Sequence, residues 1–89
     1  MATAILKIKI MPETAEKIEG IKKAVEENLT KLNAKNISFE LEPIAFGLKA
    51  IIATFAWPEE LDTDKAENAI KSVSGVSSLD IIDYRRAFG

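Results

Sequence analysis

Two segments of the chain, residues 4–11 and 37–42, alternate between apolar and polar side chains. The apolar positions are Leu6, Ile8 and Ile10 in the first segment, and Ile37, Phe39 and Leu41 in the second. Such alternation is typical of a strand that buries one face and exposes the other. We therefore expect two half-buried strands. Pro12 ends the first and Pro43 the second, because proline has no N–H to donate to a strand ladder.

Two further segments are expected to form strands without this alternation. Residues 48–57 are apolar at nearly every position, and Pro58 follows them. An apolar run of this length is typical of a central strand with both faces covered. Residues 76–84 are also rich in apolar side chains. Their pattern predicts a last strand but leaves its register open.

Helical spacing marks the segments between these strands. Residues 15–32 carry an apolar stripe at intervals of three and four, formed by Ile18, Ile21, Val25, Leu29 and Leu32. Residues 66–73 carry a shorter stripe, and Asp64 with Glu67 has the spacing of a capping box before it. Gly75 is expected to cap this second helix, whereas Gly20 lies inside the first, where glycine costs about 1 kcal/mol relative to alanine.

The element order is therefore strand, helix, strand, strand, helix, strand within 89 residues. It predicts an α+β protein of the ferredoxin-like βαββαβ kind, with a four-stranded antiparallel sheet and two helices on one face. We expect residues 1–89 to form a single domain, since the length suits one compact core. This fold hosts many unrelated functions, so function has to be argued from individual residues.

Composition excludes several kinds of chemistry. The sequence has no cysteine and no histidine, so disulfides, thiol nucleophiles and histidine bases or metal ligands are all absent. None of the four glycines belongs to a phosphate-binding loop. The longest apolar stretch, residues 50–57, is too short to span a bilayer, and Lys7 and Lys9 interrupt the segment where a signal peptide would be apolar. We expect a cytoplasmic protein with neither membrane contact nor covalent chemistry.

Charge is unevenly distributed along the chain. Residues 1–37 carry a net charge of +2, residues 38–83 a net charge of −6, and residues 84–89 a net charge of +2. A domain with an acidic balance is a poor candidate for binding nucleic acid through phosphates. An RNA-recognition motif would also need several aromatic side chains on its central strands, and only Phe55 lies in the interior of one. We expect no direct nucleic-acid contact.

Phe46 is the first candidate for a binding role. It lies between Pro43 and Gly47 in the short connection between the second and third strands. Proline before it and glycine after it would fix a turn and present the ring to a partner's pocket, as an anchor residue. Alternatively, the ring folds back as a lid over the core, and the pattern favours neither arrangement.

The second candidate is the C-terminal segment, residues 84–89. Arg85 and Arg86 stand next to each other there, and they are the only arginines of the chain. A strand that ends in two arginines can carry cationic groups into another molecule's anionic site. The alternative is a frayed, solvated tail, which is the commoner state of chain ends.

Several of these residues resemble the guanine-nucleotide exchange domain of translation elongation factor 1-beta, most closely its short archaeal form. Pro43-Ile44-Ala45-Phe46-Gly47-Leu48-Lys49 is similar to the family's Pro-x-Gly/Ala-Phe/Tyr-Gly-Ile/Leu-Lys stretch. Further similarity lies in Thr63-Asp64 with Glu67, and in Val76-x-Ser78-x-Asp80-Ile81. The resemblance covers essentially the whole chain. It implies an exchange module that stands alone and promotes GDP release and GTP loading on the GTPase elongation factor 1-alpha.

The resemblance also implies roles for individual residues. Phe46 would enter a pocket on the GTPase domain and disturb the elements that hold the nucleotide, and a terminal cation would approach the magnesium site. The family's penultimate lysine falls on Arg86, which is a departure, and Arg85 remains an alternative for the same role. The acting residues would be Phe46, Arg85 and Arg86, and the partner-binding residues would be Phe46, Gly47, Lys49, Arg85, Arg86 and Phe88. No cofactor is implied beyond the Mg-GDP bound to the partner.

Two alternatives remain open at this level. A small-molecule regulatory domain has the same element order, although the segment after the first strand is not the glycine-rich loop that would favour it. The apolar third strand also leaves its open face undecided. Ile51, Ala53 and Phe55, or the residues of the other parity, would form a second contact patch for a partner, unless that face is covered by its neighbours.

Overall fold

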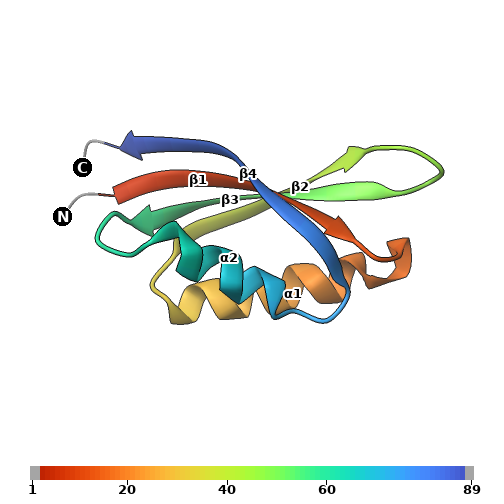
Figure 1. The fold of residues 1–89 in the computed structure, drawn as a ribbon, viewed down its shortest axis with the longest axis horizontal. Helices are drawn as coiled ribbons and strands as arrows, with labels where there is room; N and C mark the ends of the chain where they lie inside the picture. The colour runs from red at the N-terminus through yellow and green to blue at the C-terminus, as the bar shows by residue number, and fades with distance from the viewer. Residues whose placement is uncertain (1–2, 88–89) are drawn as a thin grey trace.

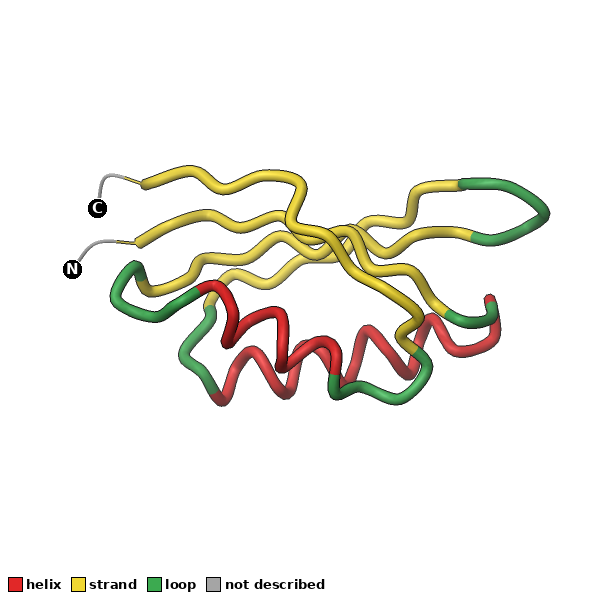
Figure 2. The backbone as a smooth tube through the Cα atoms, viewed as in Figure 1, coloured by secondary structure: helices red, strands yellow, loops and turns green. Residues whose placement is uncertain are grey.

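A computed structural model describes residues 3–87. Its elements follow the predicted order, and a short 3₁₀ turn, Ala15–Lys17, leads into the first helix. The elements are β1 (Thr3–Pro12), α1 (Ile18–Lys31), β2 (Lys35–Pro43), β3 (Lys49–Pro58), α2 (Thr63–Lys71) and β4 (Val76–Ala87). Both helices lie on the same face of the sheet, and the other face is left open (Figures 1 and 2). The predicted ferredoxin-like fold is confirmed.

The four strands form one antiparallel sheet in the order β2-β3-β1-β4. β1 is therefore paired on both sides, to β3 and to β4, and its side chains alternate between buried and more exposed positions. Because β1 and β4 run in opposite directions, Thr3 at the start of the sheet pairs with Ala87 at its end. This pairing brings the two ends of the described chain together at one end of the sheet (Figure 1).

The hydrophobic core lies between the sheet and the two helices. On β3, the side chains that face the helices are Ile51, Ala53, Phe55 and Trp57. The rings of Phe55 and Trp57 meet edge to face, with centroids 5.9 Å apart and an interplanar angle of 77°. This geometry places the positive edge of one ring against the negative face of the other. The apolar stripes of both predicted helices contribute to the same core.

The register of β3 shows which of its side chains face the helices and which face the other side of the sheet. Ile51, Ala53 and Phe55 lie in the core, so they do not form a patch for a partner. The opposite parity includes Ala50 and Ile52, and both are buried. Ile52 is paired in register with Lys9 on β1 and with Glu40 on β2. The long side chains of these two residues flank it. Of the two alternatives that the sequence left open, the middle of β3 therefore takes the second, in which both of its faces are covered.

Local boundaries differ from the sequence expectation at α2 and β2. The N-cap of α2 is Asp62, whose side chain makes no capping hydrogen bond, so the expected box of Asp64 and Glu67 does not form. Gly75 is not the helix cap either, because the C-cap is Ser72. Gly75 instead takes a positive φ of 98° in the turn before β4. β2 begins earlier than expected, at Lys35, and an irregularity in its pairing includes Asn36.

The last strand is longer than expected. The apolar pattern ended at Tyr84, whereas β4 continues to Ala87. The reason is tertiary: the polar residues at its end still pair with β1, Arg85 opposite Ile5 and Arg86 opposite Ala4. Backbone hydrogen bonding to a central strand therefore extends the element beyond its hydrophobic signal. This extension places both candidate arginines within the sheet.

Candidate functional site

The connection between β2 and β3 is a tight turn. The N–H of Leu48 donates to the carbonyl of Ala45 at 2.9 Å, and the N–H of Ile44 donates to the carbonyl of Leu48 at 2.9 Å. The two central residues, Phe46 and Gly47, have φ values of 54° and 78°. Positive φ at both central positions is the signature of a type I′ turn, whose twist matches that of the flanking strands. Residues 45–47 thus close the hairpin between Ile44 and Leu48, which are joined by a backbone hydrogen bond.

This turn points the Phe46 side chain into solvent. Its relative exposure is 103%, so the ring contacts essentially nothing in the described chain. Folding back as a lid over the core, the alternative left open by the sequence, is thereby excluded. Gly47 is exposed beside it, and Lys49 is exposed at the base of the turn, where it pairs with Pro43. An exposed aromatic ring on a hydrogen-bonded turn has the form of an anchor for a partner's pocket.

Two more apolar side chains accompany Phe46 at this end of the molecule. Leu41 and Ile44 are 43% and 44% exposed, although both are large and apolar. The hairpin extends past the layer formed by the helices, so no helix covers its end (Figures 1 and 2). We call Leu41, Ile44 and Phe46 the hairpin tip. Sequence reasoning found only Phe46, because alternation alone placed Leu41 on a buried face.

The other candidate residues lie near the end of β4. Arg85 and Arg86 belong to a strand that stays paired with β1 up to Ala87. Up to that residue the chain is therefore not a frayed tail. Successive side chains of a strand point to opposite faces of the sheet. Arg86 pairs with buried Ala4 on the helix side, and Arg85 pairs with Ile5 on the open side. The two arginines therefore serve different faces. Phe88, also expected to bind a partner, lies outside the described residues.

Each arginine has a carboxylate neighbour. The Nε of Arg85 lies 3.0 Å from Oδ2 of Asp83, and the Nε of Arg86 lies 3.0 Å from Oε1 of Glu59. Both arginine side chains are 78% exposed. The pair of Arg85 with Asp83, whose side chain is 38% exposed, is a surface ion pair that contributes at most about 1 kcal/mol, so a partner can displace it at little cost. The guanidinium groups are thus held near the sheet and remain accessible.

The hairpin tip and the arginines lie at opposite ends of the molecule. The described chain measures 42 × 21 × 18 Å, and the two groups mark the ends of its long axis (Figure 1). Arg86 shares a row of the sheet with Ala4 and Trp57. The stretch of β3 from Lys49 to Trp57 alone spans about 26 Å at the usual rise of a strand. The structure therefore does not bring the sequence-predicted residues together into one cluster.

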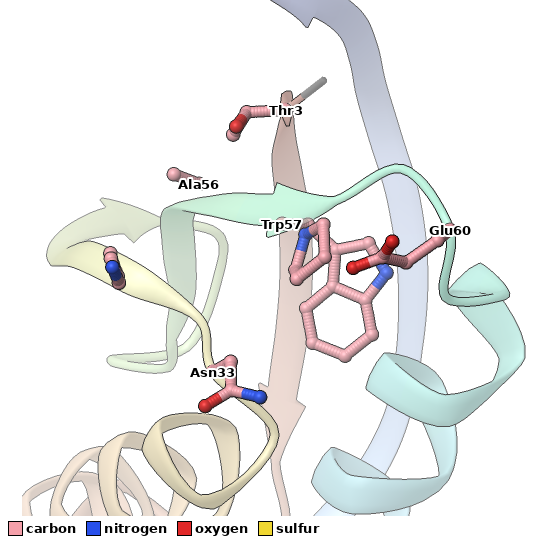
Figure 3. A pocket seen from close by; sticks show the side chains of 7 residues that line it. Thr3, Asn33, Ala56, Trp57 and Glu60 are labelled. Carbon is pink, nitrogen blue, oxygen red and sulfur yellow. The ribbon is translucent and has the colours of Figure 1, made fainter. Parts of the chain in front are cut away.

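A hollow of about 300 Å³ lies near the arginine end, at the edge formed by the start of β2 and the end of β3 (Figure 3). Its lining residues are Thr3, Asn33, Lys35, Ala56, Trp57, Pro58 and Glu60. Asn33 lies on one side of this hollow, and Trp57 and Glu60 on another (Figure 3). No sequence motif indicated it, because its lining comes from three separate segments that the sheet brings together.

Among residues 3–87, acidic side chains do not gather into a group of three or more that could hold a metal ion. Neither helix within that range has the length and apolar character needed to cross a bilayer.

Comparison with known proteins decides the family. The model of the EF-1 guanine nucleotide exchange domain matches residues 5–87. The chain belongs to this family. The resemblance drawn from residues 43–49 is thereby confirmed. The match spans every element of the EF-1 exchange domain described here, from β1 to the end of β4, and so includes both the hairpin tip and the arginines.

Individual relatives agree with this assignment. The chain is 38% identical to elongation factor 1-beta of Methanocella arvoryzae, over 99% of this chain and 100% of the relative. It is 39% identical to elongation factor 1-beta of Methanosarcina barkeri, over 97% and 99% of the two chains. A solved structure, the ACT domain from GTP pyrophosphokinase of Chlorobium tepidum, superposes with a TM-score of 0.56 at 18% identity, over 88% and 96%. At that identity it shows a shared fold alone.

Proposed function

We propose that this protein is a guanine-nucleotide exchange factor for the GTPase elongation factor 1-alpha, and that it acts in the cytoplasm during protein synthesis. It would promote release of GDP so that GTP can bind. The observation that carries the proposal is the family match over residues 5–87, together with relatives named elongation factor 1-beta along nearly their full length. The alternative, a small-molecule regulatory domain, is supported only by a likeness of fold.

In this proposal the hairpin tip supplies affinity. Phe46 enters an apolar pocket of the GTPase, and Gly47 and Lys49 contact the rim of that pocket. Burying a fully exposed phenylalanine ring contributes about 1.5–3 kcal/mol. The turn is already formed in the free protein, so little backbone order has to be acquired on binding. Leu41 and Ile44 extend the apolar contact, since both are about half exposed beside the turn.

The end of β4, which carries Arg85 and Arg86, would weaken the binding of GDP to the GTPase. Mg²⁺ holds GDP on a GTPase by bridging phosphate and protein oxygens in a strict octahedral geometry. A side-chain cation brought to that site competes with Mg²⁺ and weakens the hold on the diphosphate. Arg86 stands where the family has lysine, and its planar fork binds a phosphate or carboxylate through two hydrogen bonds, which a lysine cannot do. Arg85 and Phe88 would contact the surface around it.

No covalent step is needed for this activity. The partner holds both the nucleotide and the metal, and this chain changes only how tightly they are held. The distance between the hairpin tip and Arg86 means that one partner molecule is contacted at two separated points. The rigid sheet between them would fix the position of the arginines once Phe46 has docked.

The test is release of a fluorescent GDP analogue from purified elongation factor 1-alpha, with Mg²⁺ present and unlabelled nucleotide in excess. The protein is added at about one tenth of the GTPase concentration. Release of most of the analogue, at a rate proportional to the protein added, would establish catalytic turnover. An unchanged release rate, with a GTPase shown to bind and hydrolyse GTP, would remove the exchange proposal.

A further inference from the structure

The turn that follows β3 is fixed from two sides. The N–H of Leu61 donates to the carbonyl of Pro58 at 3.1 Å, which closes the turn around Glu59 and Glu60. The indole Nε1–H of Trp57 donates to the carbonyl of Leu61 at 3.1 Å. Trp57 itself is fully buried and packs against Phe55. The backbone of Glu59 is therefore held by the core rather than left to solvent.

The Glu59 side chain is correspondingly sheltered. It is 20% exposed, in contrast to the 78% of Arg86, whose Nε lies 3.0 Å from Glu59 Oε1. Within residues 3–87, this oxygen is shielded from solvent and accepts no aligned hydrogen bond. A carboxylate oxygen removed from water is costly unless a positive charge lies beside it. Arg86 supplies that charge, so Glu59 is the fixed member of the pair and Arg86 the exposed one.

Strand register explains how residues from two different strands meet. Trp57, Ala4 and Arg86 occupy one row across β3, β1 and β4, and Glu59 follows two residues after Trp57. The outer strands of such a row are separated by about 10 Å. Ala4 lies between them and carries only a methyl group, which leaves room for two long side chains to approach each other over β1.

We propose that Glu59 is a positioning residue for the exchange activity, a role that rests on the proposed function. Its carboxylate contacts the Nε of Arg86. The two terminal nitrogens of a guanidinium form a separate edge, which can bind an anionic oxygen pair in a bidentate manner. With Nε beside the Glu59 carboxylate, this terminal edge stays free for an anionic group at the partner's nucleotide site. Glu59 thereby limits the positions that the Arg86 guanidinium takes.

The test compares Glu59→Gln with Glu60→Gln, a matched control in the next position of the same turn. GDP-analogue release is measured over a range of concentrations of each variant, so that maximal rate and half-saturating concentration are obtained separately. We expect Glu59→Gln to lower the maximal rate about threefold to tenfold, with the half-saturating concentration changed less than twofold. Glu60→Gln should match the unmodified protein. In an Arg86→Ala background, Glu59→Gln should cause no further loss.

A second readout needs no partner. In a ¹⁵N NMR spectrum, the Nε–H signal of Arg86 should shift in Glu59→Gln and stay in place in Glu60→Gln. The Nε–H signal of Arg85, whose neighbour is Asp83, should not move in either variant. Trp57 is the only tryptophan, and its indole N–H signal reports whether the turn stays intact in both variants.

Each outcome decides something specific. Equal exchange kinetics for Glu59→Gln and the unmodified protein would overturn the positioning role. Equal losses in Glu59→Gln and Glu60→Gln would also overturn it, because the turn as a whole would then matter rather than the ion contact. If the unmodified protein fails to accelerate release, the proposed function fails. The Arg86 signal would still show separately whether Glu59 holds the guanidinium.

Discussion

Phe46 occupies a backbone conformation that costs free energy. Its φ of 54° lies in the left-handed region, where an L-residue with a Cβ is disfavoured by about 1–2 kcal/mol. The ring gains no compensating contact within the described protein, because it is fully exposed. Type I′ turns prefer asparagine at this position, followed by the glycine that is already present as Gly47. The free protein is therefore less stable with phenylalanine at position 46 than it would be with asparagine there.

This strain gives a prediction in which stability and activity change in opposite directions. Phe46→Asn should raise the free energy of unfolding by about 1 kcal/mol, because asparagine tolerates the left-handed conformation. The corresponding rise in Tm for a domain of this size is about 4–8 °C. The same variant should lose exchange activity at least tenfold, since the anchor ring is gone. Calorimetry and GDP-analogue release provide the two measurements.

Phe46→Tyr serves as the control for this substitution. It keeps the ring and the same backbone preference, so both Tm and exchange rate should stay close to those of the unmodified protein. A Phe46→Asn protein that exchanges nucleotide at the normal rate would show that the hairpin tip is not an anchor. If the Tm of Phe46→Asn fell instead of rising, the turn would not be of type I′.

At the scale of the elements, α1 contains a residue that lowers its stability, Gly20. Gly20 lies in its first turns and is exposed, and apart from its chain neighbours and the surrounding helix backbone, no atom lies within 4 Å of where a Cβ would be. Its φ is not positive, so alanine fits without backbone strain. Glycine in a helix interior is about 1 kcal/mol less favourable than alanine. Nothing in the surrounding structure explains why the helix would require glycine there.

Gly20→Ala should therefore stabilise the fold by about 0.5–1 kcal/mol, measured from the denaturant midpoint with an unchanged m-value. Exchange activity should be unaffected, because Gly20 belongs neither to the hairpin tip nor to the strand end that carries the arginines. Gly75→Ala is the contrasting variant: its Cβ would lie 2.8 Å from Cδ of Lys17 at a φ of 98°, so it should destabilise. A destabilised Gly20→Ala protein would contradict this account of α1.

The elements could be predicted from the sequence because their signals are local. Alternation in residues 4–11 and the spacing of Ile18, Ile21 and Val25 reflect which face each residue buries, and the structure confirms both. Strand ends are different. β4 continues past Tyr84 because β1 supplies hydrogen-bonding partners for Arg85 and Arg86, and no local pattern in the polar segment reports that pairing. The N-cap of α2 likewise depends on how the chain leaves the sheet.

The candidate site could be predicted only in part. The chemistry of Phe46, Arg85 and Arg86 was apparent from residue type and position in the chain. The exposure of Leu41 depends on how far the hairpin extends past the helices, and the contact of Glu59 with Arg86 joins residues that are distant in the sequence. Both are tertiary facts. They follow from strand lengths and register, which hydrophobic patterning does not specify.

At the scale of the whole molecule, one continuous sheet joins the hairpin tip to the arginines, and we expect the two candidate sites to make separable contributions. Phe46→Ala should mainly raise the half-saturating concentration for exchange, because it removes a docking contact. Arg86→Ala should mainly lower the maximal release rate and weaken binding to the GTPase much less. Since the two sites are far apart, the free-energy losses should add in the double variant. Titrations of GDP-analogue release and direct binding measurements check both parts.

Two results would contradict this division of roles. Equal losses of binding and of exchange in Arg86→Ala would argue against a role at the magnesium site. A double variant no worse than Phe46→Ala alone would mean that the arginines act only through docking of the hairpin. The second result would confine the function of the protein to the hairpin tip.

The pairing of Thr3 with Ala87 has a practical consequence for any engineered form of this protein. Whatever is attached before Thr3 or after Ala87, whether an affinity tag, a fluorescent protein or a surface linker, emerges at the same end of the sheet as Arg86 and Glu59. Fusions at either end therefore crowd the same surface.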